Sequence, residues 1–266
     1  MTHGLALLLA LLLLCTPSAK PLGWQKHRGS SASNDQHNGS RTKTSSLGCI
    51  KSYSISDISS ALNSASAAPS IDSVDRAIDV IKLSTDVQKA SLSMMAIGLS
   101  SDGKSVDYGA LRASEEFSAY QTIVAGLRSV DLSALARCTD AQRSVFFINL
   151  YNSLVVHANI VVGPPVDSPE QRSLFFSGQT GAFYDVGGSV FSPDDIEHGV
   201  LRSNALHRST HNGFDDSKRF FREGDSARGA LALAQTDCRI HFVLNCGAVS
   251  CPPIRILSGT LMYCHV

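Results

Sequence analysis

Apolar residues recur at helical spacing through the first half of the chain and predict a series of amphipathic helices. Three stripes come first, formed by Ile55, Ile58 and Leu62, then by Ile71, Val74, Ile78 and Ile81, and then by Val87, Met94 and Ile97. Ser70 is a suitable N-cap for the second stripe, and the glycine-containing stretch 98–103 ends the third. A further helix carries Phe117, Tyr120, Ile123, Val124 and Leu127, with Arg128 in its last turn. We expect residues 47–135 to form a helical lead-in in which Met94 and Met95 fill the core.

The next segment is apolar on nearly every side and predicts a central buried helix. Thr139 and Asp140 open it, and the sequence continues as AQRSVFFINLYNSLVVHANIVV. Asn149 and Asn152 stand three residues apart on one face of this helix. Because a buried amide must find hydrogen-bond partners, these two either tie down backbone or orient a functional group.

Residues 182–192 predict a β-hairpin that leads directly into a helix. Strand-forming residues flank Gly187 and Gly188, which suit a two-residue turn with positive φ. Ser192 is the expected N-cap of the helix, and Pro193 the first helical residue.

The helix after the hairpin runs from 194 to 202 and carries a candidate histidine. Asp194, His198 and Arg202 fall on one side of it, and Glu197 adjoins His198. A carboxylate partner would orient the imidazole and favour its charged form. An exposed ion pair without a functional role is an equally good interpretation.

Charged and polar residues fill the stretch 204–237, which has little apolar periodicity and predicts a long surface excursion. His207 and His211 are spaced to share a helix face, but no third ligand follows at a recognised spacing. We therefore expect no metal, and no sequence feature indicates a cofactor.

The segment CRIHFVLN, residues 238–245, has the alternation of a strand and ends at two cysteines, Cys246 and Cys251. Pro252 suits the first turn of a helix, which would place Ser250 or Cys251 at the N-cap. A thiol at that position faces unpaired backbone N–H groups, and these favour the thiolate. Cys251 is therefore the predicted nucleophile.

The number of cysteines supports a competing interpretation. Of seven in the chain, six follow the N-terminal apolar run, at positions 49, 138, 238, 246, 251 and 264. An even number in an exported protein predicts up to three disulfides, one of them closed between Cys246 and Cys251. On composition this interpretation is somewhat the stronger of the two, and a bridged Cys251 has no nucleophilic role.

The N-terminus predicts export. Leu5 to Cys15 form an apolar run too short to cross a membrane, followed by Pro17 and small residues, so 1–19 is expected to be a signal peptide. Residues 20–46 have the polar composition of a disordered linker, and Asn38 begins a glycosylation sequon. We expect a secreted glycoprotein without a membrane span after cleavage.

Composition and charge narrow the class of protein. The 266 residues are 43% hydrophobic and 17% charged, with 23 basic and 23 acidic side chains. These values describe an ordinary globular protein. The predicted helices and hairpin add a helical lead-in packed on a mixed domain of helices and a small antiparallel sheet at 136–266. The balanced charge disfavours nucleic acid as a partner.

Three stretches occur in an order that resembles the DUF547 family, whose function is unknown. They are FFINLYNSLVVH, SPDDIEHGVLR and CRIHFVLNCGAVSCPPIR, and the likeness covers about residues 106–255. The resemblance implies an α+β domain related to permuted papain-like thiol hydrolases. Its motif positions are Asn149, Tyr151, Asn152, Glu197, His198, Cys246, Cys251 and Pro252. The family continues beyond Arg255 with a further helix, so a shortened domain is expected here.

Three functional hypotheses follow. The first is a secreted thiol-dependent hydrolase or acyltransferase acting on a peptide, protein or acyl substrate. Cys251 is its nucleophile and His198 its general acid and base, with Asn149 or Glu197 orienting the ring. The second is a non-catalytic secreted interaction module with structural disulfides. The third and weakest is thiol–disulfide exchange by Cys246 and Cys251, whose four-residue separation departs from C-x-x-C.

Overall fold

The computed structural model describes residues 61–64, 76–101, 105–165, 168–205, 219–248, 251–254 and 257. The predicted signal peptide, the linker, the sequon at Asn38 and the histidines at 207 and 211 lie outside these residues. So do Ser70 and the cysteines at positions 15, 49 and 264.

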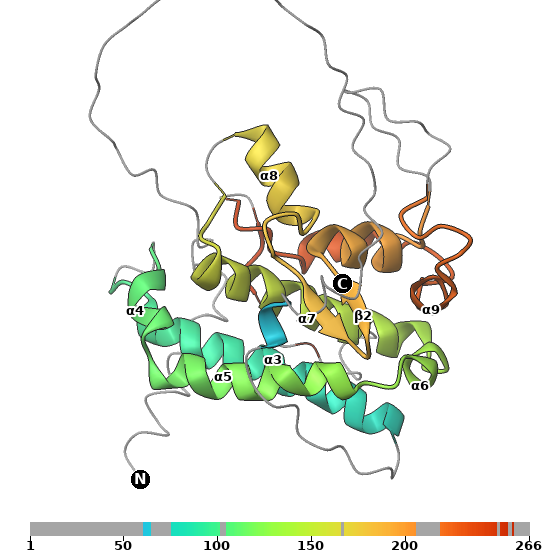
Figure 1. Ribbon diagram of the computed structural model, residues 1–266, viewed down its shortest axis with the longest axis horizontal. Helices are drawn as coiled ribbons and strands as arrows, with labels where there is room; N and C mark the ends of the chain where they lie inside the picture. The colour runs from blue at the N-terminus through green and yellow to red at the C-terminus, as the bar shows by residue number, and fades with distance from the viewer. Residues whose placement is uncertain are drawn as a thin grey trace, which may run out of the picture.

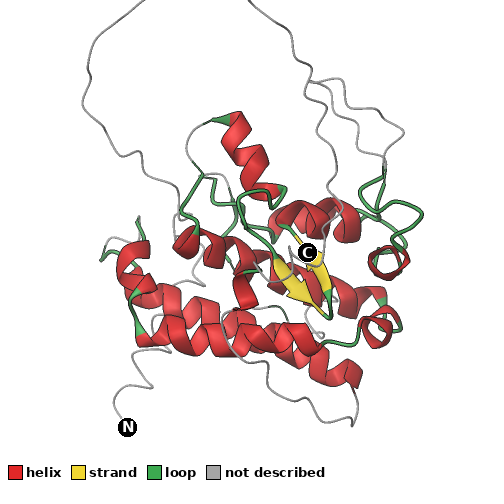
Figure 2. Cartoon of the chain, in the orientation of Figure 1, coloured by secondary structure: helices red, strands yellow, loops and turns green. Residues whose placement is uncertain are grey.

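Helices dominate the described part of the chain (Figures 1 and 2). The α-helices are α3 (Arg76–Gly98), α4 (Tyr108–Arg112), α5 (Glu115–Ala125), α6 (Leu132–Ala136), α7 (Asp140–Val161), α8 (Pro169–Phe176) and α9 (Ser226–Gly229). Shorter 3-10 helices are η1 (Leu62–Ser64), η2 (Gly126–Ser129) and η4 (Cys238–Phe242), and η3 (Asp195–Leu201) is a π-helix. Strands β1 (Tyr184–Val186) and β2 (Ser189–Phe191) pair antiparallel, so the predicted combination of helices with a small antiparallel sheet is confirmed.

The predicted helical lead-in packs against the central helix. α3 and α5 lie side by side, and α3 also runs along α7 (Figure 1). Ile78 and Ile81 of the second stripe share the single helix α3 with the third stripe, and this helix ends at Gly98 as expected. Ile71 and Val74 lie outside the described residues. Val87, Met94 and Met95 are buried, whereas Ile97 is 55% exposed and does not join the core. α5 buries Phe117, Tyr120 and Val124, so the predicted core contacts of that helix are confirmed.

α7 is the central helix that the sequence predicts. A capping box between Thr139 and Gln142 fixes its start, and every side chain from Ser144 to Ile160 is buried. Its length and hydropathy would also suit a membrane span, but 94% of its most apolar stretch is buried inside the structure. It therefore forms the core against which the other elements pack.

The predicted hairpin is confirmed in place and in register. Tyr184 pairs with Phe191 and Val186 with Ser189 around Gly187 and Gly188, whose φ angles are 58° and 83°. A Cβ atom on Gly187 would lie 2.2 Å from the carbonyl oxygen of Val130. The turn therefore needs glycine both for its conformation and for its close approach to the end of η2.

The helix after the hairpin starts as predicted but widens into a π-helix. The Ser192 hydroxyl accepts a hydrogen bond from the Asp195 N–H at 3.1 Å, and the Asp195 carboxylate accepts one from the Ser192 N–H at 2.9 Å. Further along, the Arg202 N–H donates to the Glu197 carbonyl five residues back. Gly199 in the widened turn contacts the Phe221 ring so closely that a Cβ atom would lie 2.4 Å from it.

The predicted strand at 238–245 is wrong, because residues 238–242 form η4. Ile240 and Leu244 are buried, while Phe242 is 75% exposed. The buried positions are thus four residues apart, which is the spacing of a helix face. The alternation had assigned Phe242 to the same side as its two buried neighbours.

The predicted surface excursion is also wrong over 219–237. Phe221, Leu231 and Leu233 are buried, and α9 contacts η3 and α6. These residues join the core at irregular intervals, so they leave no periodic pattern in the sequence.

Candidate dithiol site

Two cysteine side chains meet at the end of the segment that follows η4. The Cys246 and Cys251 sulfurs are 3.2 Å apart, and both side chains are partly exposed. A disulfide requires about 2.05 Å, so the pair consists of two thiols in contact. The four described cysteines, Cys138, Cys238, Cys246 and Cys251, are all free. The bridge expected between Cys246 and Cys251 is therefore not present.

A tight loop brings the two thiols together. Asn245 accepts a hydrogen bond from the Gly247 N–H at 2.8 Å and donates one to the Pro252 carbonyl at 2.8 Å. Gly247 has a φ of 83°, and the Cys251 N–H donates to the Ala248 carbonyl at 2.9 Å. The Cys246 N–H points at the Cys251 sulfur at 3.3 Å.

The helix predicted to begin at Pro252 is absent from the described residues 251–254. The Pro252 carbonyl accepts a hydrogen bond from the Asn245 side chain. In a helix that began at Pro252, this carbonyl would accept a backbone N–H four residues further on. Cys251 is therefore not at a helix N-cap, and the expected source of thiolate stabilisation is wrong. The thiolate is stabilised by other contacts.

Asn149 and Asn152 hold the cysteine loop onto α7. The Asn152 amide donates to the Val243 carbonyl and accepts from the Asn245 N–H, both at 2.9 Å. Asn149 binds Leu257 in the same way, donating to its carbonyl at 3.1 Å and accepting from its N–H at 3.4 Å. The sequence left two roles open for these amides, and in the structure both of them bind backbone groups.

The electrostatic environment distinguishes the two thiols. A hydrogen bond from Cys251 is the main cause that lowers the pKa of Cys246 to about 6, and burial partly opposes it. The Arg172 guanidinium, 3.9 Å from the Cys246 sulfur, lowers this pKa further. The pKa of Cys251 is raised, because its proton is held by Cys246 and its side chain is partly buried. The pair thus carries one negative charge near neutral pH, centred on Cys246, whereas the sequence favoured Cys251.

His198 and Glu197 lie on η3, apart from the cysteine loop in sequence. The His198 Nε2 atom is 4.0 Å from the Asp194 carboxylate, and its ring stacks on Phe220 with centroids 5.0 Å apart. Burial and the neighbouring charges of Asp195 and Glu197 raise the pKa of Asp194 to about 7. Glu197 forms an ion pair with Arg202 at 2.7 Å. The described hydrogen bonds of the Cys251 sulfur go to Cys246 and not to this imidazole.

Tyr151 of α7 lies within electrostatic range of both groups. Its buried hydroxyl has a raised pKa, first because of burial and then because of charges on Glu197, Cys246, Asp194 and Cys251. The cysteine pair and the acidic start of η3 therefore flank the same side chain of α7. The sequence motifs of the second and third stretches are brought near one another in this way.

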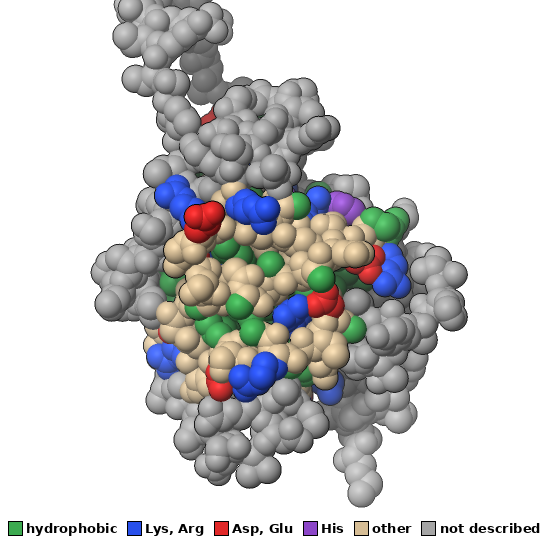
Figure 3. Space-filling view, turned by 90° about the vertical axis from the view of Figure 1, so that its right-hand side faces the viewer, with side chains coloured by type: hydrophobic (Ala, Val, Ile, Leu, Met, Phe, Trp, Pro, Cys, Tyr) green, Lys and Arg blue, Asp and Glu red, His purple; other side chains and the backbone are tan. Residues whose placement is uncertain are grey.

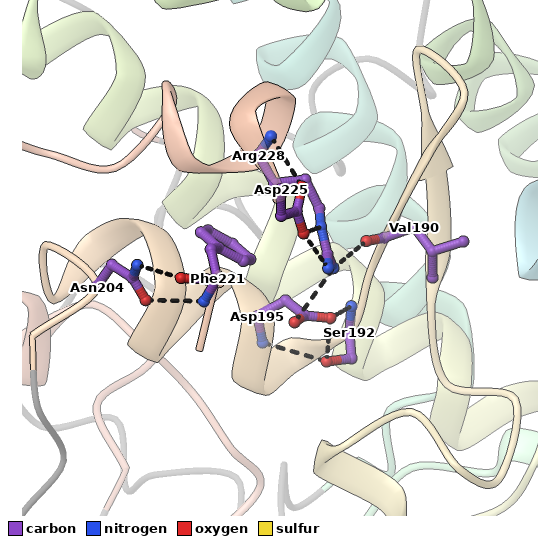
Figure 4. Close-up of polar contacts among 7 residues, drawn as sticks. All are labelled: Val190, Ser192, Asp195, Asn204, Phe221, Asp225 and Arg228. Carbon is purple, nitrogen blue, oxygen red and sulfur yellow. Dashed lines mark hydrogen bonds and ion pairs between the residues drawn. The ribbon is translucent and has the colours of Figure 1, made fainter. Parts of the chain in front are cut away.

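A buried ion-pair cluster fixes the start of η3 (Figure 4). Arg228 of α9 pairs with Asp225, lies 3.4 Å from the Asp195 carboxylate and donates to the Val190 carbonyl at 3.0 Å. Its guanidinium also covers the Phe221 ring at 4.9 Å. This cluster joins the hairpin, η3 and α9, so the position of His198 depends on a segment that the sequence assigned to the surface.

Sequence reasoning missed two residues of the dithiol site. Arg172 carried no signal, because it lies 74 positions before Cys246 and outside the three motif stretches. Asn245 carried a signal, since in an Asn–Cys–Gly sequence the asparagine side chain commonly accepts a hydrogen bond from the backbone two residues on and so stabilises a turn.

On the face shown in Figure 3, basic and acidic side chains are scattered, mainly toward the rim of the described surface, and several adjoin a side chain of opposite charge. Within the described residues there is no cluster of three or more metal-ligating side chains.

Comparison with known proteins identifies only a family. No curated protein and no solved structure matches the chain. Residues 135–263 match the family described as "Protein of unknown function, DUF547". This segment contains both cysteines, η3 and α7. Residues 135–263 are therefore a DUF547 domain, which makes up just under half of the chain.

Proposed function

We propose that the Cys246–Cys251 pair carries out thiol–disulfide exchange with a disulfide-bearing substrate. The observation that carries this proposal is the contact of two partly exposed sulfurs at 3.2 Å, one of which holds the negative charge. An attacking thiolate and a resolving thiol are the two groups that exchange requires. The exported location expected from the N-terminus suits such a reaction, because disulfides persist in oxidising compartments.

The reaction proceeds in two displacements. The Cys246 thiolate attacks one sulfur of the substrate disulfide, forms a mixed disulfide and releases the other substrate sulfur as a thiolate. Cys251 then loses its proton to solvent and attacks the Cys246 sulfur. This step forms the Cys246–Cys251 disulfide and releases the second substrate thiolate. The protein loses two electrons, and the substrate disulfide gains them.

The loop supports the second displacement. Asn245 holds both ends of the turn, and Asn152 holds Asn245 on the buried helix α7. The two sulfurs need to approach by only about 1.2 Å to reach the length of a disulfide bond. The resolving thiol is therefore pre-positioned, which favours closure over escape of the mixed disulfide.

The test uses the reduced full chain and the neutral substrate 2-hydroxyethyl disulfide, followed by mass spectrometry of the intact protein. We expect the wild type to lose two hydrogens without accumulating an adduct. Cys251→Ser should accumulate a mixed disulfide on Cys246, and Cys246→Ser should react at least tenfold more slowly at pH 7. Cys238→Ser is the control, because this exposed cysteine lies outside the pair. Equal rates for the wild type and Cys246→Ser would refute the proposal.

A second candidate is the thiol-dependent hydrolase or acyltransferase, with a permuted papain-like arrangement. It is favoured by the proximity of Tyr151 to both the cysteine pair and the acidic residues beside His198. His198 would act as general acid and base, with Glu197 or Asn149 orienting it and Cys246 or Cys251 as the nucleophile.

A thioester substrate separates the two candidates. If the protein is an acyl-transfer enzyme, His198→Asn should lower thioester cleavage by a hundredfold or more, and one cysteine of the pair should be dispensable. If it is an exchange enzyme, His198→Asn should leave the reaction with 2-hydroxyethyl disulfide within about twofold of the wild type. Failure of both reactions would favour the non-catalytic interaction module.

A further inference from the structure

Arg172 is the basic side chain that contacts the dithiol site. It lies on α8, and its guanidinium is 3.9 Å from the Cys246 sulfur. The same guanidinium lies over the Phe176 ring, 5.5 Å from its centroid, which restricts its orientation. The side chain is partly exposed, so a substrate that reaches Cys246 also reaches Arg172.

Among the described residues, no carboxylate forms an ion pair with Arg172. Glu197 and Asp194, which act electrostatically on Tyr151 together with the two cysteines, have another partner or a raised pKa. Glu197 pairs with Arg202, and the pKa of Asp194 is raised to about 7. On α8 itself, Glu170 accepts a hydrogen bond from Ser168 at the helix N-terminus. The negative charge that Arg172 faces is therefore that of the Cys246 thiolate.

This charge disappears when Cys246 forms a mixed disulfide. A disulfide sulfur is neutral, so the guanidinium then has no anionic partner among the residues that the structure describes. A carboxylate near the substrate sulfur would take the place of the thiolate and form a charge-assisted hydrogen bond with the guanidinium. An ammonium group at the same position would be repelled.

We propose that Arg172 makes the site selective for disulfides that carry a carboxylate beside the reacting sulfur. This inference rests on the proposed exchange reaction and specifies its substrate class. Acidic thiol compounds and cysteines flanked by Asp or Glu both present this chemistry. Arg172 is thus a specificity-determining residue, and its contact with the attacking sulfur places it beside the first displacement.

Three disulfides of nearly equal size provide the test: 3,3′-dithiodipropionate, 2-hydroxyethyl disulfide and cystamine, which are anionic, neutral and cationic. The rate of oxidation of the reduced full chain is measured with each and divided by the rate of dithiothreitol with the same compound. We expect the wild type to prefer the anion over the cation. In Arg172→Gln this ratio should fall by about fivefold to tenfold, the change expected for one charge pair near a protein surface.

The ratio of the anion rate to the cation rate reports the selectivity of the site and is independent of how nucleophilic Cys246 is. Loss of Arg172 also raises the pKa of Cys246, but this change affects the three disulfides alike and cancels in the ratio. Arg112→Gln, which removes the same charge at an exposed position on α4, should leave the ratio unchanged. The preference should also weaken between 20 mM and 500 mM salt, because screening shortens the range of the interaction.

The outcomes distinguish the two proposals. If all three disulfides react with the wild type but the ratio is the same in Arg172→Gln, exchange stands and the role of Arg172 is refuted. If none of them reacts, the exchange reaction itself is refuted. Peptide disulfides with acidic or basic flanking residues then identify the kind of substrate. Faster reaction of the acidic peptide than of the basic one indicates a protein substrate. A preference for dithiodipropionate without a preference between the peptides indicates a small acidic thiol compound.

Discussion

The two thiols of the site are chemically unequal although their side chains touch. Cys246 receives a hydrogen bond from Cys251 and faces Arg172, while Cys251 holds the remaining proton. The same contact therefore lowers one pKa and raises the other, and the difference assigns the roles of attacking and resolving group.

Removal of Cys251 should raise the pKa of Cys246. A hydrogen bond to a charged group contributes about 1.5–3 kcal/mol, which corresponds to about one to two pKa units. The pKa of Cys246 is therefore expected to move from about 6 to between about 7 and 8 in Cys251→Ala. Alkylation of Cys246 by iodoacetamide across pH 5–9, followed by peptide mass spectrometry, measures this shift. Cys251→Ser keeps a donor and should shift less; an unchanged midpoint in Cys251→Ala would contradict the assigned hydrogen bond.

At the scale of elements, η3 is held in place by side chains that are distant in sequence. Asp195 lies at its start and is buried, so desolvation raises its pKa while Arg228 lowers it. The guanidinium of Arg228 also bridges to β2 through the Val190 carbonyl. The hairpin, the π-helix and α9 therefore form one connected unit, which positions His198 and Glu197.

Breaking this unit should be costly, and the two partners should be coupled. Arg228→Met leaves Asp195 buried without its cation and is expected to lower the free energy of unfolding by about 3–5 kcal/mol. The double variant Arg228→Met with Asp195→Asn should lose about 1–3 kcal/mol less than the sum of the single losses. Urea denaturation measures all three. As a control, Arg239→Met removes an exposed ion pair with Asp237 and should change the free energy of unfolding by less than about 1 kcal/mol. If the losses of Arg228→Met and Asp195→Asn simply add in the double variant, the coupling between the two residues is excluded.

The elements that local sequence predicts are those with local causes. The start of α7 follows from the Thr139–Gln142 capping box, and the hairpin turn follows from two adjacent glycines. Segment 238–245 differs from its predicted strand because no strand of the described residues pairs with it, and burial of Ile240 and Leu244 selects a helical turn.

The same distinction holds for the site. The sequence identified Cys246, Cys251 and the two asparagines as unusual, because their types and spacing are local features. It did not identify Arg172, which reaches Cys246 only through the packing of α8. It favoured Cys251 as the nucleophile, whereas the contacts of the pair lower the pKa of Cys246. Electrostatic roles depend on neighbours in space, which a single sequence does not show.

At the scale of the whole molecule, a buried polar network links the lead-in helices to the central helix. Tyr120 of α5 contacts the Tyr184 hydroxyl of β1 at 2.7 Å, and that hydroxyl contacts His157 of α7 at 3.0 Å. His157 is fully buried, and burial lowers its pKa to about 3. The packing of the three elements therefore requires a neutral imidazole.

This requirement makes the fold sensitive to acid. In the unfolded chain the pKa of His157 returns to about 6.5, so between pH 6.5 and about 3 the unfolded state binds a proton that the folded state does not. The stabilisation is complete above pH 6.5 and is lost by about 1.4 kcal/mol per pH unit as the pH falls. Urea unfolding at pH 7, 6, 5 and 4 measures this slope. His157→Gln should be less stable at pH 7 but should show a shallower slope, whereas His241→Gln, at an exposed position, should keep the slope of the wild type.

Asn204 and Phe221 have a structural consequence of their own. The Asn204 amide donates to the Phe221 carbonyl and accepts from its N–H, both at 2.9 Å, although the two residues are 17 positions apart. These two hydrogen bonds fix the distance between Asn204 and Phe221. Since the entropy of closing a loop grows only slowly with its length, residues can be added or removed between Asn204 and Phe221 at little energetic cost. We therefore expect that a reporter or an affinity tag can be inserted between Asn204 and Phe221 without disturbing the reactions of the two cysteines.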